Sequence, residues 1–343
     1  MNNLEINNRT IYNYGKYRVM IVFSKDNFKR NFKPKNIIIN NNPTNKGAFS
    51  SIKKIYSRKK FMGLFGKKGE EKDIILKNTE LDNEGNEING LIFHMNLEEN
   101  YKNDNKSLKY LCTLYQFGFI MIGENPKRLY SIIEKCGINL YKYFGELKEK
   151  NSRLTKLTKI VKLIHIFKEC CEAVKIIHDM GYLHLDIKPE NFMIKDNQVK
   201  IIDFGIVKEN KYETLPTFGT SKYIASDWII NKRNNVMTTL TYHHDIFSLG
   251  CMFIELLYGY VFGKYIEMAC PIINEGQLRT EIINYRASYP ERYEEMLETI
   301  RKDCNGFNEN TINPLIEIIE GMVNPVKRYQ SIDLLINDLN NIK

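Results

Sequence analysis

The chain has 343 residues, of which 43% are hydrophobic and 27% are charged. This composition is typical of a globular protein with a sizeable core, and it excludes collagen-like, mucin-like and wholly disordered chains. The net charge of +9 arises from 50 basic and 41 acidic residues spread along the chain, so charge alone identifies no acidic partner and gives no reason to expect nucleic acid binding.

A chain of this length exceeds the usual domain of about 100 to 200 residues, which favours two domains or one bilobal unit. No apolar run approaches the roughly 20 residues that span a bilayer, and the best candidate, 117–123, is far too short, so no membrane span is predicted. The first residues lack a basic segment followed by an apolar core, so no secretory signal is predicted and we expect a cytoplasmic protein.

The cysteines are seven in number and are never spaced as C-x-x-C. An odd, scattered set favours reduced, mostly buried thiols over a disulfide framework or a zinc site. The seven are Cys112, Cys136, Cys170, Cys171, Cys251, Cys270 and Cys304.

In chain order, the first predicted segment is an Asn-rich N-terminal extension, 1–42, which carries apolar strand-like runs at 17–23 and 37–39 but does not form a domain. Short β-type runs then dominate to residue 136 and predict a small sheet. One helix interrupts this sheet, because apolar residues recur there at spacings of three and four. The predicted strands are 49–56, 73–77, 114–122 and 128–134, and the helix is marked by Ile88, Leu91, Ile92 and Met95.

After residue 136 the pattern changes to long amphipathic helices. They are predicted at 157–180, 245–258, 311–323 and 330–342. We therefore expect an α+β, bilobal fold with a small β-rich lobe, 43–136, and a larger helical lobe, 137–343.

The most informative stretch is LHLDIKPENFMI at 183–194, followed by KIIDFG at 200–205. Asp186, Asn191 and Asp203 carry hard oxygen atoms that suit Mg²⁺ bound to a polyphosphate, which points to phosphoryl transfer. The alternative is a surface Asp, a Lys-Pro turn and a chance DFG, but the spacing and the flanking strands disfavour this coincidence.

These residues resemble the eukaryotic-type protein kinase family, serine/threonine type, whose H-R-D-x-x-x-x-N and D-F-G patterns match 184–191 and 203–205. The resemblance covers roughly 43–342 and implies a bilobal kinase fold that uses ATP and Mg²⁺. It implies that Asp186 accepts or orients the substrate hydroxyl and that Lys188 lies against the transferred phosphate. It also implies that Asn191 and Asp203 hold the metal.

The same resemblance makes Lys77, at the end of DIILK, the lysine that grips the α- and β-phosphates of ATP, although an ordinary edge-strand lysine is the alternative. The helix glutamate that would pair with Lys77 is open among four acids. Glu87 is favoured because Leu91, four residues later, is apolar and can pack into the core. The other three candidates are Glu84, Glu98 and Glu99.

Other residues of the ATP site are also implied by the resemblance. Segment 45–52 occupies the place of the Gly-rich loop but keeps a single glycine. Side chains at the other positions are expected to hinder the approach of backbone amides to the phosphates and so to weaken nucleotide binding. An isoleucine gatekeeper is followed by the hinge at 134–136, and another isoleucine replaces the small residue above the adenine. For any one of the aliphatic residues, a core role is the default. The residues assigned to this site are Asn45, Lys46, Gly47, Ala48, Phe49, Ser50, Ser51, Ile52, Ile75, Ile133, Glu134, Cys136 and Met193.

Supporting positions downstream match the family as well. Thr220 lies in the Gly-Thr pair typical of serine/threonine kinases, Asp227 is expected to pair with Arg328, and Asp245 is expected to brace the catalytic loop. These are predicted as structural supports. Because Asp is one methylene shorter than the usual Glu, the pair with Arg328 is expected to be strained or bridged by water.

Leu185 stands where many kinases carry an arginine that binds a phosphate on the activation loop. We therefore expect activity to depend little on phosphorylation of Tyr212, Thr214 or Thr217. The insertion at 57–72 mixes apolar and basic residues, and a solvated hairpin tip is favoured over docking to a membrane or an acidic partner.

The function expected from these residues is ATP-dependent phosphorylation of Ser or Thr side chains on protein substrates. Two alternatives stay open. The depleted Gly-rich loop and the variant near Asp227 fit a pseudokinase that serves as a scaffold or binding module. A small-molecule kinase of related fold is disfavoured by the G-T-x-x-Y-x-A segment at 219–225, which resembles a peptide-positioning loop.

Overall fold

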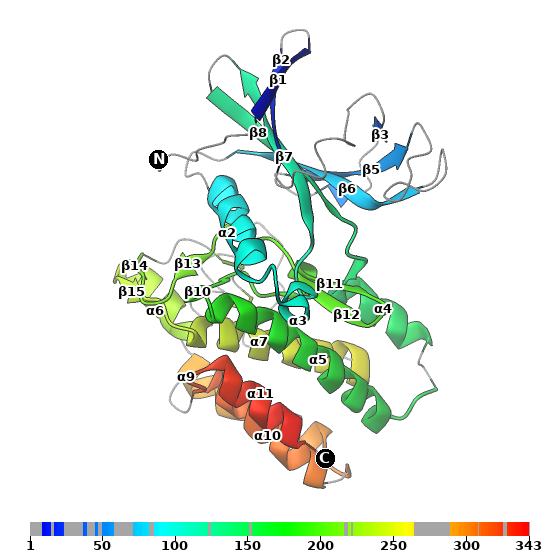
Figure 1. Ribbon diagram of the computed structural model, residues 1–343. Helices are drawn as coiled ribbons and strands as arrows, with labels where there is room; N and C mark the ends of the chain where they lie inside the picture. The colour runs from blue at the N-terminus through cyan, green and yellow to red at the C-terminus, as the bar shows by residue number, and fades with distance from the viewer. Residues whose placement is uncertain are drawn as a thin grey trace. The chain divides into compact units, whose positions relative to one another are not determined.

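The computed structural model (Figure 1) divides into two units, Met1–Cys136 and Gly137–Lys343, and the division falls where the sequence pattern changes from strands to helices. The α+β class, with a β-rich first unit and a mainly helical second unit, is confirmed. The structure describes residues 9–14, 17–23, 37–39, 45–46, 50–57, 71–81, 86–122, 125–150, 153–215, 219–220, 222–263, 289–307, 309–324 and 328–342.

The first unit is built on an antiparallel sheet with the strand order β1-β2-β7-β8-β6-β5-β3, and β4 pairs with β5. Runs of β-branched and aromatic residues explain most of these strands. The strands are β1 (Arg9–Tyr14), β2 (Tyr17–Phe23), β3 (Ile37–Ile39), β4 (Asn45–Lys46), β5 (Ser50–Ser57), β6 (Glu71–Glu80), β7 (Leu114–Ile122) and β8 (Asn125–Glu134).

The segment predicted as a separate extension contributes strands to this sheet. β2 pairs with β7 over six residue pairs, from Arg18 opposite Met121 to Phe23 opposite Gln116, and β3 pairs with β5. The strand-like runs were therefore interpreted correctly, but their partners lie far along the chain, and no local pattern reveals such pairing. The insertion that was predicted between two strands lies outside the described residues at 58–70, between β5 and β6.

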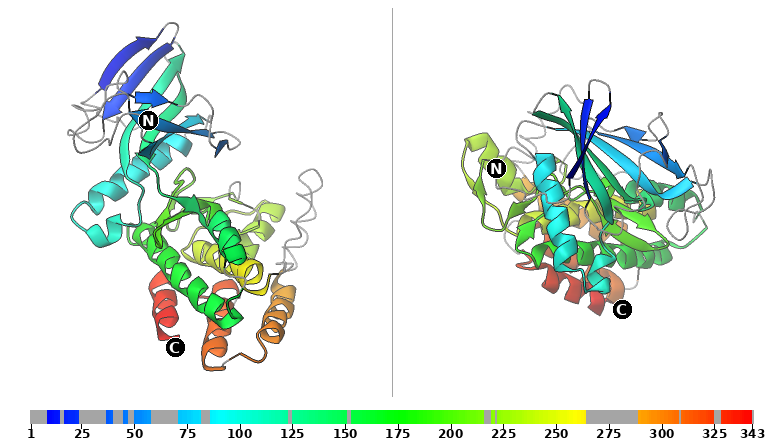
Figure 2. Two further views of the ribbon diagram at one scale, coloured as in Figure 1. Left: turned by 90° about the vertical axis from the view of Figure 1, so that its right-hand side faces the viewer. Right: turned by 45° about the horizontal axis from the view of Figure 1, so that its top comes forward.

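Helix α2 (Asn86–Asn100) packs on one face of the sheet, as Figure 2 shows from two sides, and the short α3 (Asn105–Leu108) follows it. Leu91 of α2 joins a buried cluster with Leu114, Phe117 and Leu129 of the strands. The helix was predicted correctly, but its most buried side chain is Leu97, which is fully inaccessible and was not among the predicted apolar positions.

The second unit consists of helices around one buried core helix, α7. Nearly every residue of α7 is buried, while α10 packs against it and α11 packs against α5 (Figure 1). The helices are α4 (Leu140–Lys150), α5 (Lys156–His178), α6 (Ser226–Asn234), α7 (His243–Leu256), the π-helical η3 (Leu257–Phe262), α9 (Tyr289–Asp303), α10 (Glu309–Val323) and α11 (Ile332–Asn341).

Short strand pairs hold the loops of this unit. The pairs are β9 (Ile138–Asn139) with β11 (Phe192–Lys195), β11 with β12 (Gln198–Ile201), β10 (Tyr182–Leu183) with β13 (Lys208–Glu209), and β14 (Glu213–Thr214) with β15 (Thr238–Thr239).

The segment formed by α7 and η3 is the one described helix that is long and apolar enough to cross a membrane by length and composition alone. It was missed as a long apolar segment because it contains two His residues, Asp245 and Glu255. In the most apolar window of this segment, 83% is buried inside the second unit. That burial is the property of a core helix.

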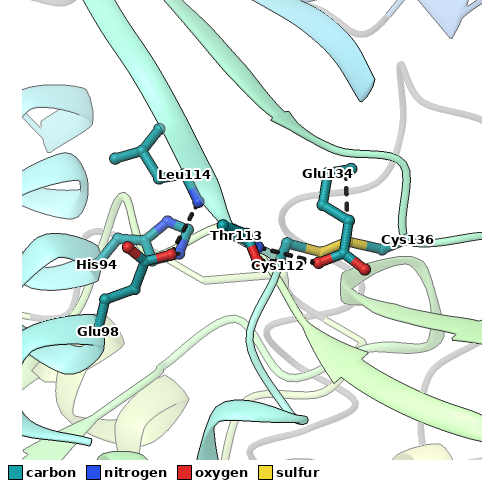
Figure 3. The surroundings of a disulfide bond; sticks show 7 residues. All are labelled: His94, Glu98, Cys112, Thr113, Leu114, Glu134 and Cys136. Atoms are coloured by element: carbon teal, nitrogen blue, oxygen red, sulfur yellow. Dashed lines mark hydrogen bonds and ion pairs between the residues drawn. A yellow bond between two sulfur atoms is a disulfide. The ribbon is translucent and has the colours of Figure 1, made fainter. Parts of the chain in front are cut away.

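Cys112 and Cys136 are joined by a disulfide, with Cα atoms 6.2 Å apart (Figure 3). The prediction of reduced thiols is therefore wrong for this pair. The two cysteines lie 24 positions apart and meet because β7 and β8 form an antiparallel ladder, which spacing alone does not reveal. The other described cysteines, Cys170, Cys171, Cys251 and Cys304, are buried and form no disulfide in the described part of the chain. Burial raises the pKa of the Cys304 thiol to about 11.

Candidate active site

The carboxylate of Asp186 lies at the centre of a group of polar side chains in the second unit. Its Oδ1 accepts a hydrogen bond from the Thr220 hydroxyl at 2.6 Å, and its Oδ2 lies 2.7 Å from Lys188 Nζ. Lys188 Nζ also donates to Thr220 Oγ1 at 3.0 Å. A carboxylate, an ammonium group and a hydroxyl are therefore held in mutual contact by charge-assisted hydrogen bonds.

Thr220 has a closer role than the sequence suggested. It was predicted as a structural support, whereas its hydroxyl contacts both Asp186 and Lys188. The pattern of the Gly-Thr pair identified the residue, but 34 positions separate it from Asp186 and 32 from Lys188. Only the folded chain reveals that contact.

Asn191 is buried beside Asp186. Its amide nitrogen donates to the Asp186 backbone carbonyl and to Oδ2, both at 2.8 Å. Because the nitrogen is used in this way, the amide oxygen of Asn191 is turned away from Asp186 and can act as a ligand for a cation.

A β-hairpin brings Asp203 close to Asn191 along the backbone. Strands β11 and β12 are joined by Asp196 and Asn197, both in the left-handed conformation that Asp and Asn tolerate, with φ of 52° and 62°. At the open end of the hairpin the Ile202 amide donates to the Asn191 carbonyl at 3.0 Å. Asp203 follows, exposed to solvent and itself left-handed with φ of 72°.

The two predicted metal ligands thus lie at the same end of one hairpin, and their oxygen atoms are the hard donors that Mg²⁺ prefers. Among the described residues, no cluster of three or more His, Cys, Asp or Glu side chains is arranged to hold a metal. A magnesium ion at Asn191 and Asp203 would therefore need further oxygen ligands from water or phosphate, which is the usual manner of Mg²⁺ binding.

Asp245, at the start of α7, braces the loop that carries Asp186, as predicted from the resemblance. It is completely buried and accepts hydrogen bonds from the backbone amides of His184 and Leu185, both at 2.8 Å, and from His178 Nε2 at 2.9 Å. Burial alone would favour the neutral acid, but these donors outweigh it and hold the pKa of Asp245 below its usual value.

The hydrogen bonds of Asp245 hold Leu185 in an unfavourable backbone conformation. Leu185 has a φ of 66°, a left-handed conformation that costs a residue with a Cβ about 1–2 kcal/mol. Its amide hydrogen bond to Asp245 and its burial against Leu183, Trp228 and Leu240 offset that cost.

His184 links the loop that carries Asp186 to the segment before Asp203, a role that the motif did not reveal. Its Nδ1 accepts from the Asp186 amide at 3.2 Å, and its Nε2 lies 3.1 Å from the Ile202 carbonyl. Since a backbone amide can only donate, Nδ1 is the acceptor, so the proton resides on Nε2 and is donated to Ile202. The neutral ring thereby positions both predicted acids through their backbones.

The predicted pair of Asp227 and Arg328 forms directly. Arg328 Nη1 donates to Asp227 Oδ2 at 3.0 Å across 101 positions of sequence, so the expectation of a bridging water is wrong, whereas strain in the pair stays a prediction. Burial opposes ionisation of Asp227, but nearby His244 and Arg328 outweigh it and lower the pKa of Asp227.

In the first unit, Lys77 lies on the sheet face that α2 covers. Ile75 is paired with Ile133 and Lys77 with Ser131 across β6 and β8, and cross-strand partners share a face. Ile133 packs against the cluster that contains Leu91 of α2. Lys77 is half-buried on that face, where the resemblance expects a phosphate-binding lysine.

The acidic partner of Lys77 stays a prediction. Glu98 accepts from the Leu114 amide at 2.8 Å, and Glu99 forms an exposed ion pair with Lys102. Glu87 lies in the first turn of α2, four residues before buried Leu91, as the favoured assignment requires. Glu84 lies outside the described residues.

The remaining predicted ATP-site positions are distributed over both units. In the first unit, Asn45 pairs with Ile52 and Lys46 with Ser51 in the β4–β5 hairpin, β5 begins at Ser50, and residues 47–49 lie outside the described part of the chain. Met193, in the second unit, lies in β11 between Asn139 and Lys200.

Comparisons with known proteins show the family to which the sequence belongs. The sequence model of the protein kinase domain family matches residues 46–313. The chain is 28% identical over 248 residues to the dual specificity protein kinase TTK of Mus musculus, which covers 65% of this chain and 27% of that protein.

It is also 30% identical over 166 residues to the maternal embryonic leucine zipper kinase of Xenopus laevis, covering 46% of this chain and 22% of the relative. A third match, at 31% identity over 122 residues, is the serine/threonine-protein kinase mph1 of Schizosaccharomyces pombe, covering 32% of this chain and 18% of the relative. The matches thus span about a quarter or less of the length of each relative. Since the family model spans most of the chain, the chain belongs to the protein kinase domain family.

Proposed function

We propose that this chain transfers the γ-phosphate of ATP to Ser and Thr hydroxyl groups of protein substrates. The observation that carries the proposal is the contact group of Asp186, Lys188, Thr220 and Asn191. This group places a hydrogen-bond acceptor beside a cation, which is what the attack of a hydroxyl on a phosphate requires.

Each side chain has a role that follows from its charge. Asp186 accepts the hydrogen bond of the substrate hydroxyl and orients its oxygen towards the phosphate. Lys188 offsets negative charge that develops on the transferred group. Thr220 and Asn191 keep the carboxylate in position by donating to its two oxygens.

The cation and the nucleotide fit the remaining residues. When bound with the nucleotide, Mg²⁺ would neutralise phosphate charge, and the Asn191 amide oxygen and the Asp203 carboxylate are the atoms that would hold it. Lys77 would contact the phosphates as a point charge.

Specificity for Ser and Thr is supported by Lys188 and Thr220, which are typical of serine/threonine kinases by resemblance and which contact each other here. The name of the relative in Schizosaccharomyces pombe states serine/threonine specificity, whereas the name of the relative in Mus musculus states dual specificity. Phosphorylation of tyrosine is therefore the outcome against which the proposal is tested.

The experiment compares wild type, Asp186→Asn and Asp196→Asn in phosphate transfer from labelled ATP and Mg²⁺ to a protein mixture and to the enzyme itself. Asp196 is a matched control, because it is exposed in the β11–β12 turn, where Asn also tolerates a left-handed backbone. We expect Asp186→Asn to lose about 100-fold or more of the activity and Asp196→Asn to keep it.

The acceptor residue is identified by mass spectrometry of the labelled products, and folding of all three proteins is verified by circular dichroism. Label on Ser or Thr that depends on Asp186 supports the proposal. Label on tyrosine alone would contradict the specificity. ATP binding without transfer by folded wild type would favour the scaffold alternative.

A further inference from the structure

The disulfide between Cys112 and Cys136 closes one end of the β7–β8 ladder (Figure 3). Leu114 opposite Ile133 is the last residue pair of the ladder at this end. Just beyond it the Glu134 amide donates to the Thr113 carbonyl at 2.9 Å, and the Glu134 carboxylate accepts from the Thr113 amide at 3.1 Å. The disulfide follows directly and adds a covalent link to these hydrogen bonds.

Helix α2 is attached to the same place. Glu98 of α2 accepts a hydrogen bond from the Leu114 amide at 2.8 Å, which Figure 3 shows beside the disulfide. Three elements, α2, β7 and β8, are therefore tied together within a few residues of the two sulfur atoms.

The disulfide also lies where the chain passes from one unit to the other. Cys136 is the last residue of the first unit. The next residue, Gly137, is fixed in the second unit, because its φ is +100° and a Cβ would lie 2.1 Å from the Ile194 carbonyl oxygen. Ile138 then pairs with Ile194. With the disulfide intact, Cys136 is therefore held in the first unit by a covalent bond, and Gly137, the next residue, is held in the second unit by its close approach to Ile194.

We propose that Cys112 and Cys136 form a reversible redox site that controls how firmly this crossing segment is held. Oxidation by a low-molecular-weight disulfide removes both thiol protons, forms the protein disulfide and releases two thiol molecules, and a dithiol reverses the reaction. The reduced state is also accommodated, since Cys136 Sγ lies 3.4 Å from the Glu134 carbonyl, which a thiol can use as an acceptor.

Burial sets the access of reagents to this site. Cys112 and Cys136 are only 2% and 4% exposed, so exchange requires local opening of the ladder end. The other described cysteines are equally buried but lie in the second unit and form no disulfide among the described residues. In a reducing compartment, a disulfide of this kind would be a sensing bond and not a permanent one.

The consequence for catalysis rests on the proposed function, because the resemblance assigns 134–136 to the backbone that binds adenine. A segment already fixed in its binding conformation loses less freedom when the nucleotide binds. The oxidised form is therefore expected to bind ATP more tightly than the reduced form, with little change in the rate of the chemical step.

The experiment uses the full chain as wild type, Cys112→Ala and Cys304→Ala, each equilibrated with oxidised or reduced glutathione. Cys304→Ala is the matched control, because it removes a buried cysteine of the second unit that is not in the disulfide. Linked peptides are detected by mass spectrometry after alkylation, amide hydrogen exchange is followed at Leu114 and Glu134, and the KM for ATP is measured.

For wild type and Cys304→Ala, we expect reduction to break the link between 112 and 136 and to speed exchange of both amides by about 10-fold or more. We expect the KM for ATP to rise about 3- to 10-fold on reduction. Cys112→Ala should behave as the reduced form in both buffers.

Failure to detect the linked peptide after oxidation would overturn the proposal. So would a linked peptide whose reduction changes neither amide exchange nor the KM, since the disulfide would then be only a static bond. If no phosphate transfer occurs in any sample but amide exchange responds to reduction, the redox site stands and the proposed enzymatic function fails.

Discussion

Thr220 contacts both Asp186 and Lys188 in the candidate active site. We expect Thr220→Ala to lower kcat by about 10-fold or more, because Asp186 loses one of its donors and Lys188 loses an acceptor. Thr220→Ser keeps the hydroxyl and should stay within about threefold of wild type. Steady-state kinetics with a peptide substrate measures both variants, and equal losses in both would show that the methyl group matters instead of the hydroxyl.

His243 is a buried base whose protonation opposes folding. Burial, and to a lesser extent the positive charge of Arg328, lowers its pKa to about 3, against an ordinary value near 6.5. The unfolded chain then takes up a proton below about pH 6.5 while the folded chain does not. Stability is therefore complete above that pH and is lost as the pH falls towards 3.

We expect wild type to lose about 2 kcal/mol more unfolding free energy than His243→Leu between pH 7.5 and pH 5. Urea unfolding at both pH values measures this difference. His165→Leu, which removes an exposed imidazole of α5, is the control and should lose as much as wild type. An equal loss in wild type and His243→Leu would contradict the assignment.

At the scale of elements, the short strand pair β14–β15 holds part of the segment that follows Asp203. Glu213 pairs with Thr239 and Thr214 with Thr238, and the Leu240 amide donates to the Tyr212 carbonyl at 2.9 Å. Residues 212–214 are thus held against 238–240 by backbone hydrogen bonds.

We therefore expect the double variant Thr214→Ala, Thr217→Ala to keep turnover within about twofold of wild type. The reason is that position 185 is a leucine and carries no guanidinium that could bind a phosphate on this segment. Initial rates of both proteins, after phosphatase treatment, measure this. Loss of turnover in the folded double variant would show that phosphorylation of this segment is required.

The elements that the sequence predicted well are rich in apolar residues, either as a continuous run, as in β2, or at helical spacing, as in α10 and α11. The strand of β2 and the helices α5, α10 and α11 were predicted within a few residues of their observed bounds. By contrast, α6 was missed, because its sequence SDWIINKRN carries few apolar residues and its helical form depends on packing of Trp228 in the core.

The residues of the candidate site were predicted, together with the supporting contacts of Asp245 and of Asp227 with Arg328, but the contacts of Thr220 and His184 were not. Motif spacing identified Asp186, Asn191 and Asp203, whereas the protonation state of His184 and its bridge to Ile202 depend on atoms brought together by the hairpin. Physical contact between segments that are distant in sequence has no local signal.

At the scale of the whole molecule, Gly137 is the position where the chain enters its second unit. We expect Gly137→Ala to lower the unfolding free energy by about 2–4 kcal/mol, because the new Cβ would lie 2.1 Å from the Ile194 carbonyl oxygen at a φ of +100°. Gly181→Ala is a matched control, since Gly181 has a φ of +82° but open space around its Cβ position.

The control should lose only about 1 kcal/mol, the cost of the left-handed backbone without a clash. Urea unfolding followed by circular dichroism measures both variants. Equal losses would show that the contact with Ile194 relaxes freely and that the backbone conformation alone matters.

The larger organisation was partly visible in sequence. The change of pattern at residue 136 coincides with the observed division into units. The pairing of β2 with β7 and the disulfide were not visible, because both depend on antiparallel neighbours set by the topology of the sheet.

The buried carboxylate of Asp245 has a consequence for protein synthesis. The catalytic loop that it braces is made 60 residues earlier, which corresponds to roughly 3 to 12 s of translation at about 5–20 residues per second. Once Thr220 has been made, the nascent chain contains Asp186, Asn191, Asp203 and Thr220 but still lacks Asp245, the acceptor that holds the loop backbone. A chain that ends before Asp245 would keep these motifs without the side chain that holds the backbone of residues 184 and 185, so we expect it to lack phosphate transfer until the core helix has been made.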